Sequence, residues 1–242
     1  MLPKMQFGVM QRGVFEWHDD MRARFEELMV QARLLNALGY DSLTTGSHFA
    51  TKPHREFMQI PYLSRVMAEA PNLRLNAGIV LLALHQPLEV AEYFATMDCM
   101  SNGKMIFGCA LGYRPVEFNG FGVPEGKGLK RFMENLEAVK RLWTEETVTM
   151  KGSHFSLEDA SISVPFVQQP HPPIWMGANV DAAVKRAARV ADCWYLNPHQ
   201  KLGTLKRQMA IYREELDRLG KPFPDEVPIR REVFCAPTHE EA

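Results

Sequence analysis

The sequence lacks an excess of charge of either sign. Its 242 residues include 28 Lys and Arg against 29 Asp and Glu, which gives a formal net charge of −1. Proteins that bind DNA or RNA neutralise phosphates with clustered basic residues, and this chain has no basic excess to do so. We therefore do not expect nucleic acid among its partners.

Long apolar runs and closely spaced cysteines are missing as well. No run approaches the ~18 apolar residues of a membrane-spanning helix. The N-terminal stretch MLPKMQFGVM does not have the layout of a signal peptide. Cys99, Cys109, Cys193 and Cys235 show no C-x-x-C spacing, so neither a disulfide framework nor a thiolate metal site is indicated. These absences predict a reduced, soluble, cytoplasmic protein with no metal site and no membrane partner.

The chain instead alternates strand-like and helix-like patterns. Short apolar runs occur at residues 5–10, 40–46, 73–82, 104–112, 173–177, 192–196 and 229–236. Helical spacing separates most of them, as in the series Phe132, Leu136, Val139 and Trp143. Strands that alternate with helices predict parallel pairing with helices outside, and this number of units without a linker favours a (β/α)8 TIM-type barrel. We expect one domain over residues 1–242.

Local signals place several helix ends. Asp19 and Asp20 are candidate caps of a first helix that Gly39 ends. Pro87 suits the first turn of a later helix. The inner face of that later helix is predicted to contain Leu88, Ala91, Phe94 and Ala95.

Seven strands are one too few for the predicted barrel. The chain ends in THEEA, which resembles a capping box that leads into a helix. Either the sequence lacks the last helix-strand-helix of the barrel, or one element has been misassigned, and the capping box favours the first explanation. Two short extended runs around Gly152 predict a hairpin insertion near residues 147–165.

Four stretches at predicted strand ends have unusual chemistry. His48 follows the second strand, where a loop histidine bonded to backbone is the plain alternative to a catalytic role. Gly78–Ile79 weakens a strand interior, which indicates either a simple bulge or the close approach of a ligand.

The other two stretches have groups that suit anions. Gly112 is followed by Tyr113 and Arg114, which are able to stack or to bind an anion, or simply to form a loop rim. Gly177 and Ala178 precede a helix with Asn179 as its expected N-cap. Free N–H groups at a helix start bind phosphate, although an ordinary tight turn explains the same residues.

Taken together, five stretches resemble the bacterial luciferase-like flavin-dependent monooxygenases. They are ALGYDSLTTGSHF, GIVLLALHQPLEVAE, MSNGKMIFGCALGYRPVEFNGFG, RFMENLEAVKRLW and HPPIWMGANVDAAVKRAARVADCWYL. The resemblance extends over nearly the whole chain and preserves the order of the pieces. It implies a (β/α)8 barrel that receives reduced FMN from a separate flavin reductase and uses O₂ to oxygenate an organic substrate. The members are commonly homodimers.

The resemblance also assigns residues to the cofactor. Gly177, Ala178 and Asn179 match the family's phosphate-binding turn. Gly78–Ile79 falls where members often have a non-prolyl cis peptide beside the flavin ring. Gly112 and Tyr113 match the strand end that lines the flavin, and Trp194 lies where it would pack either near the cofactor or in the core.

Some positions depart from the luciferases themselves. Ser47 replaces the histidine that is their presumed base, and Ala110 and Leu111 replace their reactive cysteine and phosphate-binding arginine. Light emission is therefore not expected, and His48 becomes the candidate catalytic residue.

The sequence leaves rival functions open. A deazaflavin-dependent oxidoreductase of the same fold and a non-catalytic flavin-binding protein both fit the same pattern. The predicted loops are rich in aromatic residues, which indicates a small, apolar substrate. These residues are Phe15, Trp17, Phe49, Phe57, Phe118 and Phe121.

Overall fold

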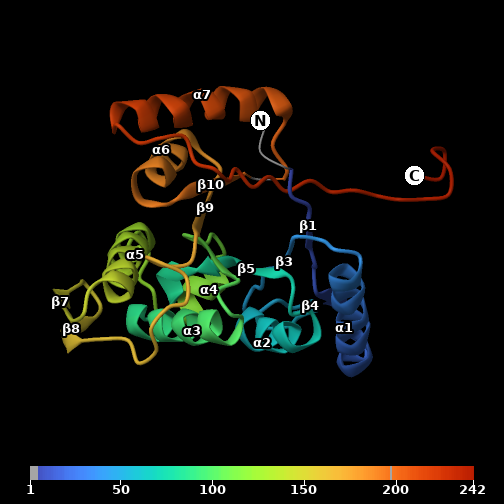
Figure 1. The fold of residues 1–242 in the computed structure, drawn as a ribbon, viewed down its shortest axis with the longest axis horizontal. Coiled ribbons are helices and arrows are strands. Elements are labelled where there is room, and N and C mark those ends of the chain that lie inside the picture. Colours follow the sequence, from blue (N-terminus) through green and yellow to red (C-terminus); the bar gives the residue numbers. More distant parts are fainter. Residues whose placement is uncertain (1–4, 197) are drawn as a thin grey trace. The chain divides into compact units, whose positions relative to one another are not determined.

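The computed structural model describes residues 5–196 and 198–242. The chain forms two compact units, the first ending at Ile174 and the second spanning Trp175–Ala242. Each unit is an α/β arrangement of its own (Figure 1). The expectation of a single domain over residues 1–242 stays a prediction.

The first unit contains four adjacent parallel strands. They lie in the order β1 (Gly8–Met10), β3 (Ser42–Thr45), β5 (Arg74–Leu81) and β6 (Met105–Ala110). All three neighbouring pairs are parallel, as predicted. The strands reach that arrangement because a helix returns the chain between them. These helices are α1 (Met21–Ala37), α2 (Gln59–Glu69) and α3 (Pro87–Met100), with a 3-10 turn, η1 (Leu82–Leu84), before α3.

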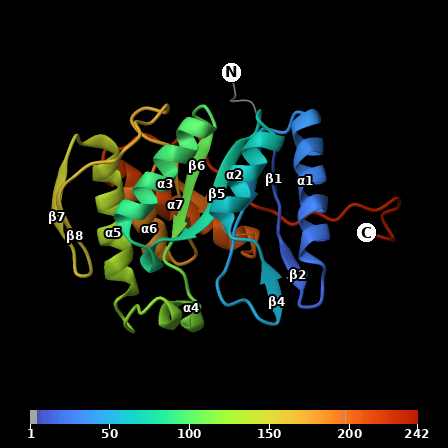
Figure 2. The same cartoon turned by 90° about the horizontal axis from the view of Figure 1, so that it is seen from below.

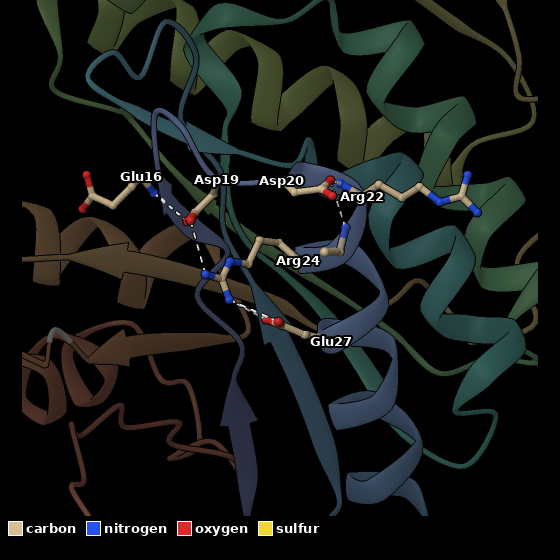
Figure 3. Close-up of polar contacts among 7 residues, drawn as sticks. Glu16, Asp19, Asp20, Arg22, Arg24 and Glu27 are labelled. Carbon is tan, nitrogen blue, oxygen red and sulfur yellow. Dashed lines mark hydrogen bonds and ion pairs between the residues drawn. The ribbon is translucent and has the colours of Figure 1, made fainter.

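The start of α1 is capped as the sequence predicts. The Asp20 carboxylate accepts hydrogen bonds from the backbone N–H groups of Arg22 (2.9 Å) and Ala23 (3.3 Å). Figure 3 shows this cap beside a second network, in which Arg24 binds both Asp19 and Glu27. A cap of this kind typically contributes about 1 kcal/mol.

Apolar faces of α3 and α5 (Gly128–Thr144) form much of the core. Pro87 occupies the first turn of α3, and the predicted core residues Ala91, Phe94 and Ala95 are buried. Leu88 is a wrong prediction, because it is 37% exposed and Val90 takes the inward position. The whole predicted stripe of α5 is buried, and it comprises Phe132, Leu136, Val139 and Trp143.

Two antiparallel two-stranded sheets accompany the parallel strands. β7 (Val148–Lys151) pairs with β8 (Ser156–Ala160) inside the range predicted for an insertion. The pairing of β2 (Val14–Glu16) with β4 (His54–Glu56) was not predicted, because each strand has only three residues and the two are far apart in sequence. The short helix α4 (Pro115–Gly120) was also not predicted.

The second unit contains a parallel pair and two helices. β9 (Ile174–Ala178) begins at the last residue of the first unit and pairs with β10 (Cys193–Leu196). Helices α6 (Asp181–Val190) and α7 (Leu202–Arg218) pack against each other (Figure 1). Trp194 is 1% exposed and donates its indole N–H to the Ala178 carbonyl at 3.0 Å, so its role is in the core.

The predicted strand at residues 229–236 is wrong. Only Ile229 makes a bridge, to Leu196, while Val233 and Phe234 are 87% and 74% exposed. A strand requires a partner along its length, and three consecutive charged residues interrupt the apolar pattern here.

The parallel α/β class is therefore confirmed, while closure into an eight-stranded barrel stays a prediction. Across residues 5–196 and 198–242, no helix has the length and apolar character needed to cross a bilayer.

Candidate functional site

Strand ends and the loops that follow them bring the predicted site residues of the first unit together. His48 follows β3, Gly78 and Ile79 lie within β5, and Gly112 and Tyr113 follow β6. Because these neighbouring strands are parallel, their carboxyl ends share one edge of the sheet. Figure 2 shows α4 and the paired strands β2 and β4 at the same end of the sheet.

The Gly78–Ile79 peptide bond is cis, as the resemblance implies. The pairing of β5 with β6 shifts register between Ala77 and Val80, so the segment is also a bulge. Ile79 is half-buried, whereas Gly78 and Val80 on either side of it are buried. A partly open aliphatic side chain in the middle of a buried strand provides an apolar contact surface for a ligand.

Backbone from three strands meets closely around Gly78. A Cβ atom on Gly46 would lie 2.7 Å from the Gly78 carbonyl oxygen. A Cβ atom on Gly108 would lie 2.6 Å from the Ala77 carbonyl oxygen. Both distances are shorter than contacts that real Cβ atoms make, so these two glycines allow the strands to approach. No side chain from Gly46 or Gly108 is able to fill this part of the sheet.

His48 contacts a buried carboxylate that no local pattern in the sequence places beside it. Its Nδ1 atom lies 2.9 Å from Oε1 of Glu117, whose side chain is fully buried. The same oxygen accepts a hydrogen bond from the Phe49 N–H at 2.9 Å. Within the described residues, Glu117 Oε2 is buried and has no hydrogen-bond partner.

This geometry defines the orientation of the imidazole. Glu117 Oε1 already acts as an acceptor for Phe49, so His48 Nδ1 donates to it. In the neutral ring, Nε2 then carries the lone pair and is free to accept a proton. The His48 side chain is 31% exposed, so it remains accessible. A histidine oriented by a buried carboxylate is the usual arrangement of a general base.

Arg114 holds the loop that carries this pair. Its guanidinium donates to the carbonyls of Phe49 (2.8 Å) and Ala50 (3.2 Å), and lies 3.6 Å from Glu117 Oε1. Arg114 is therefore engaged with protein groups. Tyr113 is 77% exposed, and its ring meets the His48 ring edge-on at 5.6 Å between centroids.

Aromatic rings line the neighbouring loops. Phe49 and Phe121 lie 4.6 Å apart, and His85 lies 5.9 Å from Phe49 and 5.8 Å from Phe121. Burial lowers the pKa of His85, which favours its neutral form. Phe49 also packs on a small core cluster formed by Leu81, Leu84 and Val123. These loops therefore present an apolar surface around Phe49.

The predicted phosphate-binding residues lie in the second unit. Gly177 and Ala178 end β9, and Gly177 is half-buried. Asn179 is not the N-cap that the sequence predicted, because Val180 takes that position and α6 begins at Asp181. The Asn179 carbonyl instead accepts hydrogen bonds from Gln200 (2.6 Å) and Gln208 (3.1 Å).

The start of α6 already contains a compensated carboxylate. Asp181 forms two hydrogen bonds with Arg207, at 2.6 and 2.9 Å, and these bonds lower its pKa to about 2. Because Arg207 neutralises Asp181, the helix start does not carry an unpaired negative charge that would repel a phosphate.

Glu117 was missed because it lies 69 positions from His48 in the sequence. One local signal was present. Pro115 is suited to the first turn of a helix, and a carboxylate two positions later is typical of that turn. That signal predicts α4, although it does not predict the contact with His48.

Comparison with known proteins agrees with this arrangement. The model of the luciferase-like monooxygenase family matches residues 5–242. The crystal structure of a monooxygenase from Streptomyces bottropensis is 26% identical, with a TM-score of 0.86 over 98% of this chain and 74% of that chain. The oxygenating constituent of 3,6-diketocamphane monooxygenase from Pseudomonas putida, in complex with FMN, is 17% identical with a TM-score of 0.85 over 98% of this chain and 70% of that chain.

Other relatives differ in cofactor or have no described function. An F420-dependent secondary alcohol dehydrogenase is 19% identical, with a TM-score of 0.80 over 94% of this chain and 68% of that chain. An uncharacterised protein of Mycobacterium tuberculosis is 33% identical over 160 residues, which are 64% of this chain and 56% of that protein. The chain spans little more than half the length of that relative and of one from Sinorhizobium fredii, of which it covers 53%. The family match over residues 5–242 establishes that the chain belongs to the luciferase-like monooxygenases.

Proposed function

We propose that the protein is an FMN-dependent monooxygenase that uses reduced FMN and O₂ to oxygenate a small organic substrate with an apolar portion. The contact between His48 and Glu117 carries the proposal, because it presents an oriented proton acceptor at the strand ends of a luciferase-like fold. We further propose a cytoplasmic location, a separate flavin reductase and a homodimer.

The residues present fit a flavin. Ile79 offers a half-open aliphatic surface of the kind that a flat ring contacts, and the surrounding strands contribute backbone in place of side chains. Gly112 and Tyr113 are proposed to line the same ring. For the second unit we retain the proposal that Gly177, Ala178 and Asn179 bind a phosphate group. When bound, reduced flavin supplies the electrons that activate O₂.

The chain's own residues have separate tasks in this proposal. Glu117 holds His48 Nδ1–H, and His48 Nε2 accepts or returns a proton at the substrate. Phe49 and Phe121 exclude water from that position. Arg114 keeps the loop closed over Glu117 through the Phe49 and Ala50 carbonyls.

Binding of reduced FMN under anaerobic conditions tests the proposal. We expect a micromolar dissociation constant, followed by O₂ consumption when air is admitted. Ile79→Ala should weaken binding by roughly three- to tenfold because buried aliphatic contact is lost. Ile60→Ala, at a half-buried position on α2, is the matched control and should leave binding unchanged. Failure of reduced FMN to bind at micromolar concentration would show that the proposal is wrong.

A deazaflavin-dependent oxidoreductase is the second candidate. The structural similarity to the F420-dependent alcohol dehydrogenase favours it. Tighter binding of the deazaflavin than of FMN, with hydride transfer that needs no O₂, would identify this function. A protein that binds FMN but leaves the autoxidation of reduced FMN unchanged would instead be a non-catalytic flavin-binding protein.

A further inference from the structure

A pocket of about 860 Å³ lies beside the His48–Glu117 pair in the first unit. Its walls come from β4, the turn after β2, the start of α1, the loop before β4 and the start of α4. Two of the residues that line it connect it to the pair. Glu56 accepts a hydrogen bond from the His48 N–H at 2.9 Å, and Arg114 lies 3.6 Å from Glu117.

The charges that line this pocket are unbalanced. Lys52, Arg55 and Arg114 face it together with a single carboxylate, Glu56. Glu56 is bonded to the His48 N–H, and Arg114 is bonded to backbone carbonyls. The lining thus has an excess of positive charge, and Lys52 and Arg55 are the cations in it that are not held by backbone carbonyls.

Both of these cations lie over one aromatic ring. The Lys52 ammonium is 5.6 Å and the Arg55 guanidinium 4.9 Å from the centre of the Trp17 ring. Among the described residues, neither has a carboxylate within 4.0 Å. Stacking on Trp17 orients Arg55 while leaving its N–H groups free to bind an oxyanion.

Asp19, the carboxylate on which Arg55 acts electrostatically, is already engaged. Asp19 accepts hydrogen bonds from Arg24 at 3.2 Å and from the Glu16 N–H at 3.0 Å (Figure 3). Arg55 acts on Asp19 only at a distance, where it helps to lower the pKa of that carboxyl after the larger effect of Arg24. The remaining walls include the apolar side chains of Met21, Phe57 and Val116.

We propose that this pocket binds the oxyanion end of an organic substrate, with Lys52 and Arg55 as the residues that recognise it. The apolar body of the substrate lies against Met21, Phe57 and Val116, and its reacting end extends to His48. The assignment of the reacting end rests on the proposed function, whereas anion binding in the pocket does not. Carboxylates and phosphate monoesters share the chemistry that the two cations recognise.

Three compounds with one apolar body test the proposal without flavin. We would measure calorimetric binding of 4-phenylbutanoate, 4-phenylbutyl phosphate and 4-phenylbutanol to the whole chain. The double variant K52M/R55M should weaken binding of the anions by about tenfold or more, because charge-assisted hydrogen bonds are lost. It should change binding of the alcohol by less than about twofold, since the apolar walls are intact.

A matched control removes two positive charges elsewhere in the same unit. The variant R65M/K130M alters Arg65 and Lys130, which are 56% and 63% exposed and lie outside the pocket. It should leave all three affinities unchanged. Equal losses in both double variants, or an equal loss for anions and alcohol in K52M/R55M, would overturn the proposal.

The remaining outcomes separate the two oxyanions and the two proposals. If K52M/R55M weakens binding of the phosphate alone, or of the carboxylate alone, the proposal is supported and the head group is identified. Lack of selective anion binding by the unmodified chain would overturn it. If reduced FMN fails to bind while the anions still bind through Lys52 and Arg55, the monooxygenase proposal fails and the anion pocket stands.

Discussion

His48 Nδ1 and Glu117 Oε1 lie 2.9 Å apart, although 69 positions separate the two residues in the sequence. The carboxylate is fully buried, and its second oxygen has no hydrogen-bond partner among the described residues. A polar group buried in this way is costly to folding, and this cost agrees with a positioning role for Glu117 rather than a stabilising one.

Substitution of Glu117 should disturb the imidazole of His48. In Glu117→Gln, the amide nitrogen either faces His48 or occupies a buried position without a partner. We expect a loss of about 1–3 kcal/mol in the free energy of unfolding. In Glu117→Leu, which removes the acceptor altogether, nitrogen NMR of labelled histidine should also show that Nδ1 of His48 is no longer the predominantly protonated nitrogen. An unchanged His48 tautomer would contradict the assigned role, and His48→Gln identifies the signal.

The close approach at Gly46 should not tolerate a methyl group. Gly46→Ala places Cβ 2.7 Å from the Gly78 carbonyl oxygen, and backbone has to move to relieve the contact. We expect a loss of about 1–3 kcal/mol in chemical denaturation, together with weaker flavin binding. Gly203→Ala in helix α7 is the control, because no atom lies within 4 Å of its Cβ. It should stabilise the protein by up to about 1 kcal/mol, since alanine favours helix more than glycine does.

Asn135 should be required for the turn that follows β5. Its side-chain amide donates to the carbonyls of Leu82 (2.8 Å) and His85 (2.9 Å), and the residue is fully buried. Asn135→Asp keeps the shape but removes both donors, so we expect a loss of about 2–4 kcal/mol in thermal or urea unfolding at neutral pH. Asn119→Asp, at an exposed position on α4, should change stability by less than about 0.5 kcal/mol. Similar losses in both variants would contradict this assignment.

Glu215 should stabilise the protein at neutral pH and lose this effect in acid. Arg189 (2.6 Å) and Arg218 (2.7 Å) bind its carboxylate, and hydrogen bonds to Arg218 and Arg189 lower its pKa from 4.5 to about 2. A carboxyl whose pKa is lower in the folded than in the unfolded protein stabilises the fold at every pH above the unfolded pKa. This stabilisation is lost as the pH falls from about 4.5 to about 2. Glu215→Gln should therefore be less stable than wild type at pH 7. Urea unfolding between pH 7 and pH 2 checks this, and a difference that does not shrink in acid would contradict it.

The sequence predicted the repeating part of the fold because local periodicity determines it. The stripe from Phe132 to Trp143 is buried throughout, and Pro87 starts α3. Leu88 was assigned to the buried face of α3, but it lies at the edge of that face and is exposed, while Val90 is buried. Residues 229–236 have strand-like composition, but strand formation depends on a partner that composition does not specify.

The site was only partly predictable for a related reason. Gly78–Ile79 and His48 stand out locally, since a glycine beside a β-branched residue and a histidine after a strand are each unusual. The partner of His48 comes from α4, and the Lys52–Arg55–Trp17 contact depends on the pairing of two three-residue strands that are distant in sequence. Such long-range contacts carry no periodic signal.

The tight apposition of backbone at Gly46, Gly78 and Gly108 has a consequence for how this protein can diversify. Substitution of any of these three glycines cannot create a new binding surface without moving the sheet, because a Cβ atom there would lie 2.7 Å or less from a neighbouring atom. New selectivity has to arise in the connecting segments instead, above all around residues 14–17, 49–57 and 113–121. Combinatorial libraries intended to change which molecule is accepted should therefore be confined to those three segments.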